Sequence, residues 1–504
     1  MQQLTGMDGL FLGVDASDAS NGIIGALLKY TAPDADAGSR ERMIERIQGR
    51  LDTIPPLRWG MTGLPVGINN AWLHEIDVNV ADHVRELTIE APGGDHELAA
   101  AVAEVMMRPL PEGPMWDFTV LRGLPDNQLA HLMRLHHGVI DGGLVQMVVD
   151  LLSDAPITPT DPADARPLTK SALPDHVEVL ARSLVNSAMS PIRLFSLTAK
   201  TGKYLLGRSK KEGALVLPAF IARMLPGEVG KPLTMLVNGH QKLIKRPEVH
   251  PLIPTIKVPA TSFNARITEN RVFAFADHNL ADFKDVGKAL GMTLNDVVIG
   301  CLTGAVRRYL QEHGGVPDRP LICSVPISLR TGQEKERWAN HVSGFWTELP
   351  THLEDPVERL HAVHEDIKVG KETFDALPSH IMRDAMRVML PISMVSISYK
   401  LMSMAPDWYP GTAWNVVVSN VRGPGKTITM CGAEMTGFWP VGFLTPGTGL
   451  NVVLQSYKDR LDFGFLGCTD LMPDLWEMVR YMEESLSELK GIVLDLQSAE
   501  AARS

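Results

Sequence analysis

Apolar residues recur along this chain with two different periods, and the alternation between them predicts a mixed α/β fold. In 127–135 every second residue (Leu129, His131, Met133, Leu135) shares one face, which is typical of a β-strand. From Gly142 to Ser153 the apolar positions instead follow helical spacing. Mixed sheets covered by helices are therefore expected, and the second half repeats the pattern. Its expected elements are strands at Arg271–Phe275 and Leu321–Ile327, helices at Leu280–Leu290 and Leu294–Leu310, and a hairpin of Leu450–Tyr457 with Leu461–Gly467.

The length of 504 residues indicates two large domains, because a single hydrophobic core stops growing at about 250–300 residues. Five prolines between Asp154 and Asp175 predict an exposed loop at the end of the first domain. We place the first domain at 1–176, a separate middle segment at 177–258 and the second domain at 259–504.

The middle segment differs from the rest of the chain in its charge. The whole chain has 48 Lys and Arg against 59 Asp and Glu, and this net charge of −11 argues against nucleic-acid binding. From Arg182 to Lys211, however, there are seven basic residues and no acidic one, interleaved with leucines and Phe195. Two interpretations remain open: helices that lie on an anionic lipid surface, or a solvated crossover between the domains.

Other features of the sequence bear on the cellular compartment. The four cysteines form no CxxC pair, so neither a zinc site nor a disulfide framework is indicated, and a reducing cytoplasm fits best. Residues 1–15 lack the basic and apolar regions of a secretory signal. The uncharged stretch Met435–Tyr457 is interrupted by prolines and glycines, which argues against a membrane span. We expect a cytoplasmic protein that meets a membrane only peripherally.

The candidate chemistry lies in the string HHGVIDG, His136–Gly142, at the end of the predicted strand. A neutral imidazole with an ordinary pKa of about 6.5 can take a proton from an alcohol and return it to a leaving group. Adjacent strand residues face opposite ways, so one histidine can enter a cavity while the other packs into the fold. Asp141 could orient the imidazole or hold the loop through an arginine. The pair could also be purely structural, and without a third ligand it predicts no metal site.

Further motifs are spread over most of the chain. They are LTGMDGLFL (Leu4–Leu12), PMWDFTVLRGL (Pro114–Leu124), TSFNARITENR (Thr261–Arg271), TLNDVVIG (Thr293–Gly300), VPISLR (Val325–Arg330), SNVRGP (Ser419–Pro424) and the strand Gly449–Tyr457. The HHxxxDG string occurs in coenzyme-A-dependent acyltransferases and condensation domains generally. Together with the other motifs, in this order, it resembles the bacterial wax ester synthase and acyl-CoA:diacylglycerol acyltransferase family.

The resemblance implies a two-domain acyltransferase fold with a tunnel between the halves. His137 would be the general base, His136, Asp141 and Gly142 would support it, and Arg330 would form an ion pair with Asp141. Acyl-CoA would be a co-substrate, with no metal and no permanently bound cofactor. The acceptor would be a lipid hydroxyl, of diacylglycerol or of a fatty alcohol, at a membrane or droplet surface. Two alternatives stay open: an acyltransferase for a polyketide or peptide hydroxyl, and a lipid-binding protein without turnover.

Asn295 is a further candidate within the predicted helix that begins at Leu294. Thr293 and Asp296 have the spacing of a capping box, which accounts for both of them without a functional role. Asn295 is left over near the positive end of the helix, where its amide could hold an alcohol or a carbonyl oxygen. Asn420 and Arg422 of SNVRGP could equally be turn residues.

Overall fold

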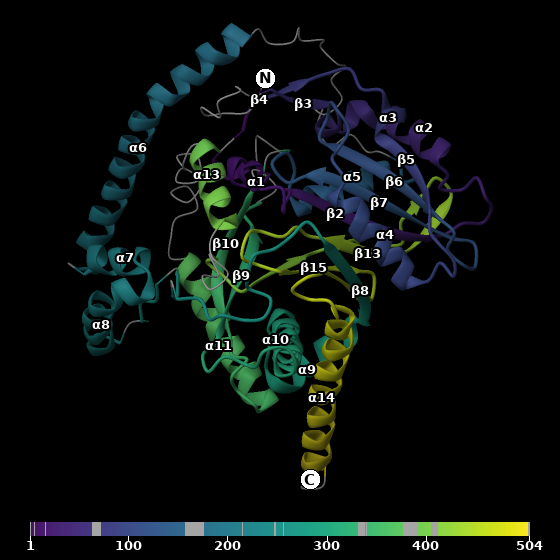
Figure 1. The fold of residues 1–504 in the computed structure, drawn as a ribbon. Helices are drawn as coiled ribbons and strands as arrows, with labels where there is room; N and C mark the ends of the chain where they lie inside the picture. The colour runs from purple at the N-terminus through teal and green to yellow at the C-terminus, as the bar shows by residue number, and fades with distance from the viewer. Residues whose placement is uncertain are drawn as a thin grey trace.

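The computed structural model describes residues 2–4, 6–15, 17–62, 72–156, 176–213, 215–245, 248–251, 253–255, 257–330, 338, 340–375, 392–404 and 412–501. In this part of the chain two six-stranded sheets, one for each half, are covered by helices (Figure 1). A small third sheet consists of β1 (Gln2–Gln3), β4 (Trp72–Glu75) and β3 (Trp59–Thr62).

The first sheet has the order β12-β13-β2-β7-β6-β5, and its core strands β2 and β7 are buried along almost their whole length. Apolar side chains cover both of its faces, one against α2 and α5 and the other against α4. The strands are β12 (Thr429–Met430), β13 (Ala433–Val441), β2 (Ile23–Thr31), β7 (Gln128–His136), β6 (Trp116–Arg122) and β5 (Val84–Thr88). The helices of this half are α1 (Gly6–Val14), α2 (Arg40–Arg50), α3 (Val80–His83), α4 (Asp95–Met107) and α5 (Gly142–Leu152), with 3₁₀ turns at Leu51–Thr53 and Pro55–Arg58.

The second sheet has the order β10-β9-β11-β14-β15-β8 and packs against helices that gather at one end of the molecule (Figure 1). Strand β11 runs parallel to both β9 and β14, whereas β14 and β15 form the antiparallel hairpin that the sequence predicts. The strands are β8 (Arg271–Asn279), β9 (Leu321–Ser328), β10 (Val342–Leu349), β11 (Val416–Val421), β14 (Leu450–Tyr457) and β15 (Arg460–Cys468). These helices are α9 (Leu280–Leu290), α10 (Leu294–Glu312), α11 (Pro356–Asp375) and α14 (Trp476–Ala501). Helix α13 (Ile392–Ser403) lies apart from them, beside α1 (Figure 1).

The two halves share a strand, since β12 and β13 lie in 259–504 along the chain but belong to the first sheet. Strand β13 pairs with β2 from Glu434↔Thr31 to Val441↔Gly25. The first sheet therefore contains strands from both sides of the boundary expected at 259.

The halves also touch closely where β13 crosses β15. A Cβ added at Gly464 would stand 1.9 Å from the Pro440 carbonyl oxygen, so only glycine fits there. Next to it the Phe438 N–H donates to Asp462 Oδ2 at 2.7 Å. The two sheets are thus joined by backbone contact as well as by side chains.

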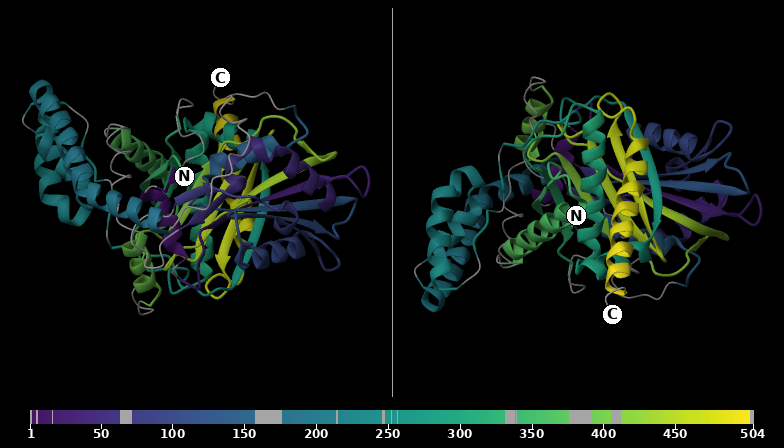
Figure 2. Two further views of the ribbon diagram at one scale, coloured as in Figure 1. Left: turned by 90° about the horizontal axis from the view of Figure 1, so that it is seen from above. Right: turned by 90° about the horizontal axis from the view of Figure 1, so that it is seen from below.

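The middle segment forms three helices that stand away from the two sheets, as Figures 1 and 2 show. They are α6 (His176–Glu212), α7 (Val216–Met224) and α8 (Gly227–Leu243), and we call them the arm. Their own core is small, with Ala222, Val237 and Val249 as its buried members. No single helix among the described residues is long and apolar enough to span a membrane, although α9 and α10, bent by 101°, satisfy both criteria as a pair.

Candidate active site

The histidine motif begins at the last residue of β7. His136 closes the strand and donates its N–H to the Met115 carbonyl at 3.0 Å, while His137 already belongs to the following turn. The His137 N–H donates to the Gly22 carbonyl at 2.7 Å, and the Val139 N–H returns to the His136 carbonyl at 2.9 Å. The alternation of side chains between the two faces of the strand was expected to include His137, but it stops at His136.

His136 is buried and held by hydrogen bonds at both ring nitrogens. The Gly138 N–H donates to Nδ1 at 3.0 Å, so the proton lies on Nε2, which donates to Asp15 Oδ2 at 2.8 Å. The other oxygen of Asp15 accepts the Gly22 N–H at 2.7 Å. This ring packs into the fold and fixes the turn, which leaves its neighbour available for chemistry.

The ring of His137 lies flat against Phe11 of α1, with ring centroids 3.7 Å apart and planes 16° apart. Phe443 approaches it edge-on, at 5.9 Å. Burial among these rings lowers the pKa of His137 from 6.5 to about 4, while its own backbone carbonyl and Asp141 act in the opposite direction. His137 is therefore neutral near pH 7, as a general base must be.

Asp141 holds the far end of the motif. Its Oδ2 accepts Arg330 Nη2 at 2.7 Å and the His341 N–H at 3.0 Å, and its Oδ1 caps α5 by accepting the Leu144 N–H at 3.0 Å. The predicted ion pair between Arg330 and Asp141 is thus present. Because Arg330 follows β9 and His341 precedes β10, Asp141 ties the histidine turn of the first half to the second sheet.

The carbonyl of His137 is held from the second half as well. Asn340 Nδ2 donates to this oxygen at 2.6 Å and to Asp8 Oδ1 of α1 at 2.7 Å. The backbone of His137 is consequently held on one side by Gly22 and on the other by Asn340.

Asn295 takes part in none of the hydrogen bonds described above for the histidine turn. Thr293 and Asp296 form the predicted capping box: the Thr293 N–H donates to Asp296 Oδ2 at 2.8 Å, and the Asp296 N–H to Thr293 Oγ1 at 3.3 Å. Asn295 Oδ1 accepts Asn420 Nδ2 at 3.4 Å. The pair lies at the end of β11 that faces the start of α5, where a Cβ at Gly142 would be 3.5 Å from Val421.

Close packing at the histidine turn requires glycine at Gly22 rather than at Gly142. The 3.5 Å contact at Gly142 is ordinary, so no crowding among the described residues requires glycine there. At Gly22 a Cβ would stand 2.6 Å from the Phe11 carbonyl oxygen and 2.9 Å from His136 Nε2. Gly22, Phe11, Asp15 and Asn340 were not identified from the sequence. Only Phe11 lies within a motif that could have indicated it, LTGMDGLFL.

Two α/β halves that meet beside the half-buried His137 define a two-domain acyltransferase fold, and solved structures share this fold. The wax ester synthase/diacylglycerol acyltransferase from Marinobacter aquaeolei VT8 is 21% identical, with a TM-score of 0.64 and coverage of 98% of this chain and 100% of that one. The first condensation domain of the CDA synthetase is 12% identical, with a TM-score of 0.55 and coverage of 98% and 96%.

The chain belongs to the wax ester synthase/diacylglycerol acyltransferase family. The model of the family's catalytic domain matches residues 4–298, and that of the WS/DGAT C-terminal domain matches 338–490. One relative, "Putative diacyglycerol O-acyltransferase Rv3740c" of Mycobacterium tuberculosis H37Rv, is 29% identical over 97% of this chain and 99% of its own. Another, "O-acyltransferase WSD" of Acinetobacter baylyi, is 24% identical over 100% of both. The family, fold class and acyltransferase function expected from the sequence are thereby confirmed.

Proposed function

We propose that this chain transfers a long-chain acyl group from acyl-CoA to the hydroxyl of a lipid, diacylglycerol or a fatty alcohol, with His137 as the general base. The observation that carries the proposal is the neutral ring of His137, stacked on Phe11 and held in place through its backbone on both sides.

The reaction needs one proton carrier. The Nδ1 atom of His137 is buried, so Nε2 is the nitrogen that takes the hydroxyl proton as the oxygen attacks the thioester carbonyl. The tetrahedral intermediate then collapses with cleavage of the C–S bond, and the imidazolium gives its proton to the departing thiolate. An ester and free coenzyme A result, without an acyl-enzyme.

The negative oxygen of the intermediate needs hydrogen-bond donors. Asn295 accepts from Asn420 through Oδ1, so its Nδ2 remains available as a donor at the N-terminal end of α10. Replacing Asn295 by Ala should therefore lower kcat more than it raises KM, as expected for an interaction that strengthens in the transition state.

The direct test is release of free thiol from a long-chain acyl-CoA in the presence of diacylglycerol, a fatty alcohol or a soluble peptide hydroxyl. His137→Ala should lower the rate by about 10²–10⁴-fold while the melting temperature stays close to that of the wild type. His136→Ala should also lower the rate, but together with the melting temperature. Undiminished turnover by His137→Ala would refute the mechanism.

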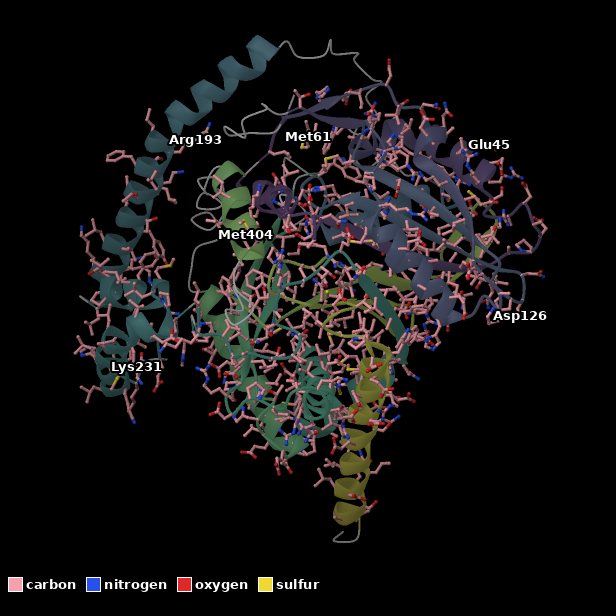
Figure 3. The ribbon with its side chains drawn as sticks, in the orientation of Figure 1. Glu45, Met61, Asp126, Arg193, Lys231 and Met404 are labelled. Carbon is pink, nitrogen blue, oxygen red and sulfur yellow. The ribbon has the colours of Figure 1, made fainter. Side chains whose placement is uncertain are left out.

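The arm supports a peripheral attachment to lipid. On α8, Val229, Leu236 and Leu243 recur at seven-residue spacing and are 57%, 69% and 81% exposed, so an apolar stripe faces outward. Phe195 of α6 is 75% exposed. Arg193 on α6 and Lys231 on α8 are labelled in Figure 3, on the same arm. The side chains of Arg182, Leu184 and Met189, part of the basic segment, lie outside the described residues.

Apolar side chains beside a basic segment fit an anionic lipid surface, where each base contributes about 1 kcal/mol. The protein would then work in the cytoplasm, attached to a membrane or droplet that holds its acceptor. Changing Lys200, Lys203, Lys210 and Lys211, all exposed, to Gln should release the protein from anionic vesicles but spare activity on detergent-dispersed substrate. Vesicle binding that resists both salt and these substitutions would instead make the arm a domain crossover.

A further inference from the structure

The backbone of His137 is fixed by a side chain from the other half of the molecule. Asn340 stands two positions before the start of β10, yet its amide reaches the carbonyl oxygen of His137 at 2.6 Å. The same nitrogen donates to Asp8 Oδ1 at 2.7 Å, and Asp8 is only 4% exposed. Asn340 thus connects α1, the histidine turn and the second sheet at one point.

The orientation of the Asn340 amide follows from its partners. A carbonyl oxygen and a carboxylate oxygen can only accept, so both must face the NH₂ group, whose two hydrogens they use. This orientation leaves the oxygen of the amide unpaired: Asn340 Oδ1 is buried and has no hydrogen-bond partner among the described residues. A buried acceptor without a partner is destabilising. The fold therefore keeps the NH₂ group of Asn340 directed toward His137, although the unpaired Oδ1 destabilises the protein.

Asn340 and the Gly22 carbonyl hold the two backbone polar groups of His137, so they fix the position from which its ring extends. The ring makes no hydrogen bond through Nδ1 among the described residues and is held by stacking on Phe11. The backbone carbonyl and the carboxylate of Asp141 raise the pKa of His137 against the lowering by burial. The aim of Nε2 therefore depends on where the backbone holds the ring.

We propose that Asn340, supported by Asp8, is a positioning residue for the general base His137. The inference rests on the proposed function, since it assigns a role within the same reaction. Neither residue touches substrate in this account. Asp8 holds the amide of Asn340, the amide holds the His137 carbonyl, and Nε2 is thereby aimed at the acceptor hydroxyl. Because Asn340 belongs to the second half, the base is correctly aimed only when the halves are assembled.

The experiment compares the full-length wild type with Asn340→Ala, Asp8→Ala and Asp8→Asn in the thiol-release assay with a soluble alcohol. Misplacement of a catalytic group by about 1 Å costs about 10²-fold in rate, so Asn340→Ala should lose about that much kcat with little change in KM. The pH at which the activity of Asn340→Ala falls on the acid side should also differ from that of the wild type. Asp8→Ala should follow the same pattern, and Asp8→Asn, which keeps an acceptor oxygen for the amide, should recover most of the rate.

Asn238 of α8 offers a matched control. Its amide also makes two hydrogen bonds, here both with the backbone of Val249 in the arm: Nδ2 donates to the carbonyl at 3.0 Å, and Oδ1 accepts the N–H at 2.6 Å. Asn238→Ala should lower the melting temperature without moving the pH profile.

Three results separate the possible failures. Wild-type turnover that does not depend on His137 would refute the proposed function. His137-dependent turnover combined with unchanged kcat and pH profile in Asn340→Ala would refute the positioning role alone. If Asn340→Ala does not fold, Asp8→Ala breaks the same connection from its other end, and an unchanged pH profile there would overturn the proposal.

Discussion

Phe11 should determine the pH range in which the enzyme works. Its ring lies 3.7 Å from that of His137, and burial is the main cause that lowers the pKa of this base to about 4. With that pKa nearly all of the base is neutral at pH 5.5, whereas with the ordinary value of 6.5 only about one tenth would be. Phe11→Ala admits water to one face of the ring, so the pKa should rise toward 6.5.

The assay is kcat/KM between pH 5 and 8 with a soluble alcohol and a medium-chain acyl-CoA, with the folded fraction checked at each pH. The wild type should be nearly level over this range, because activity is lost only as the pH falls through the folded-state pKa. Phe11→Ala should lose up to about tenfold between pH 7.5 and 5.5. Phe11→Leu is the control, since an aliphatic side chain still excludes water and should keep the level profile. A wild-type profile that falls by half near pH 6.5 would refute the reasoning.

Three further predictions concern Gly22, Arg330 and His131. Gly22→Ala should abolish most activity and lower the melting temperature, since its Cβ would stand 2.6 Å from a backbone oxygen, whereas Gly49→Ala, with open space, should change neither much. Arg330→Ala should cost about 3 kcal/mol, measured by urea unfolding, because it leaves Asp141, 2% exposed, as a buried carboxylate without its cation. His131 is fully buried with its pKa lowered to about 4. The unfolded chain therefore binds its proton more readily, and stability that is complete above pH 6.5 should fall by about 3 kcal/mol as the pH drops to 4. His131→Gln should flatten this decline in melting temperature, and parallel curves for the two proteins would show that His131 is not its source.

Features encoded by nearby residues could be predicted from the sequence. The hairpin of β14 and β15, the helix α9 and the Thr293–Asp296 capping box depend on residues a few positions apart, and all are present. The histidine motif is equally local, but the role expected for His137 and the ion pair expected between Asp141 and Arg330 came from the resemblance to the family; the ion pair is present.

The partners of the histidines could not be predicted, because they lie far away along the chain. Asp15 stands 121 positions from His136, and Asn340 stands 203 positions from His137. No period or spacing connects such residues, since their meeting depends on how β2, β7 and β10 are brought together. The length of the strand β7 was also decisive, because it ends at His136 and so places the base in a turn.

The strand that passes from the second half into the first sheet bears on how such enzymes can be recombined. A chimera that joins residues 1–258 of one relative to the remainder of another would pair β2 of the first parent with β13 of the second. The new junction would then lie inside the first sheet, along the pairing of β2 with β13. Exchanging β12 and β13 together with the N-terminal half would keep each sheet of one parentage. The border between the parents would then follow the border between the two sheets, and the fit of Gly464 against Pro440 would be the contact to preserve across it.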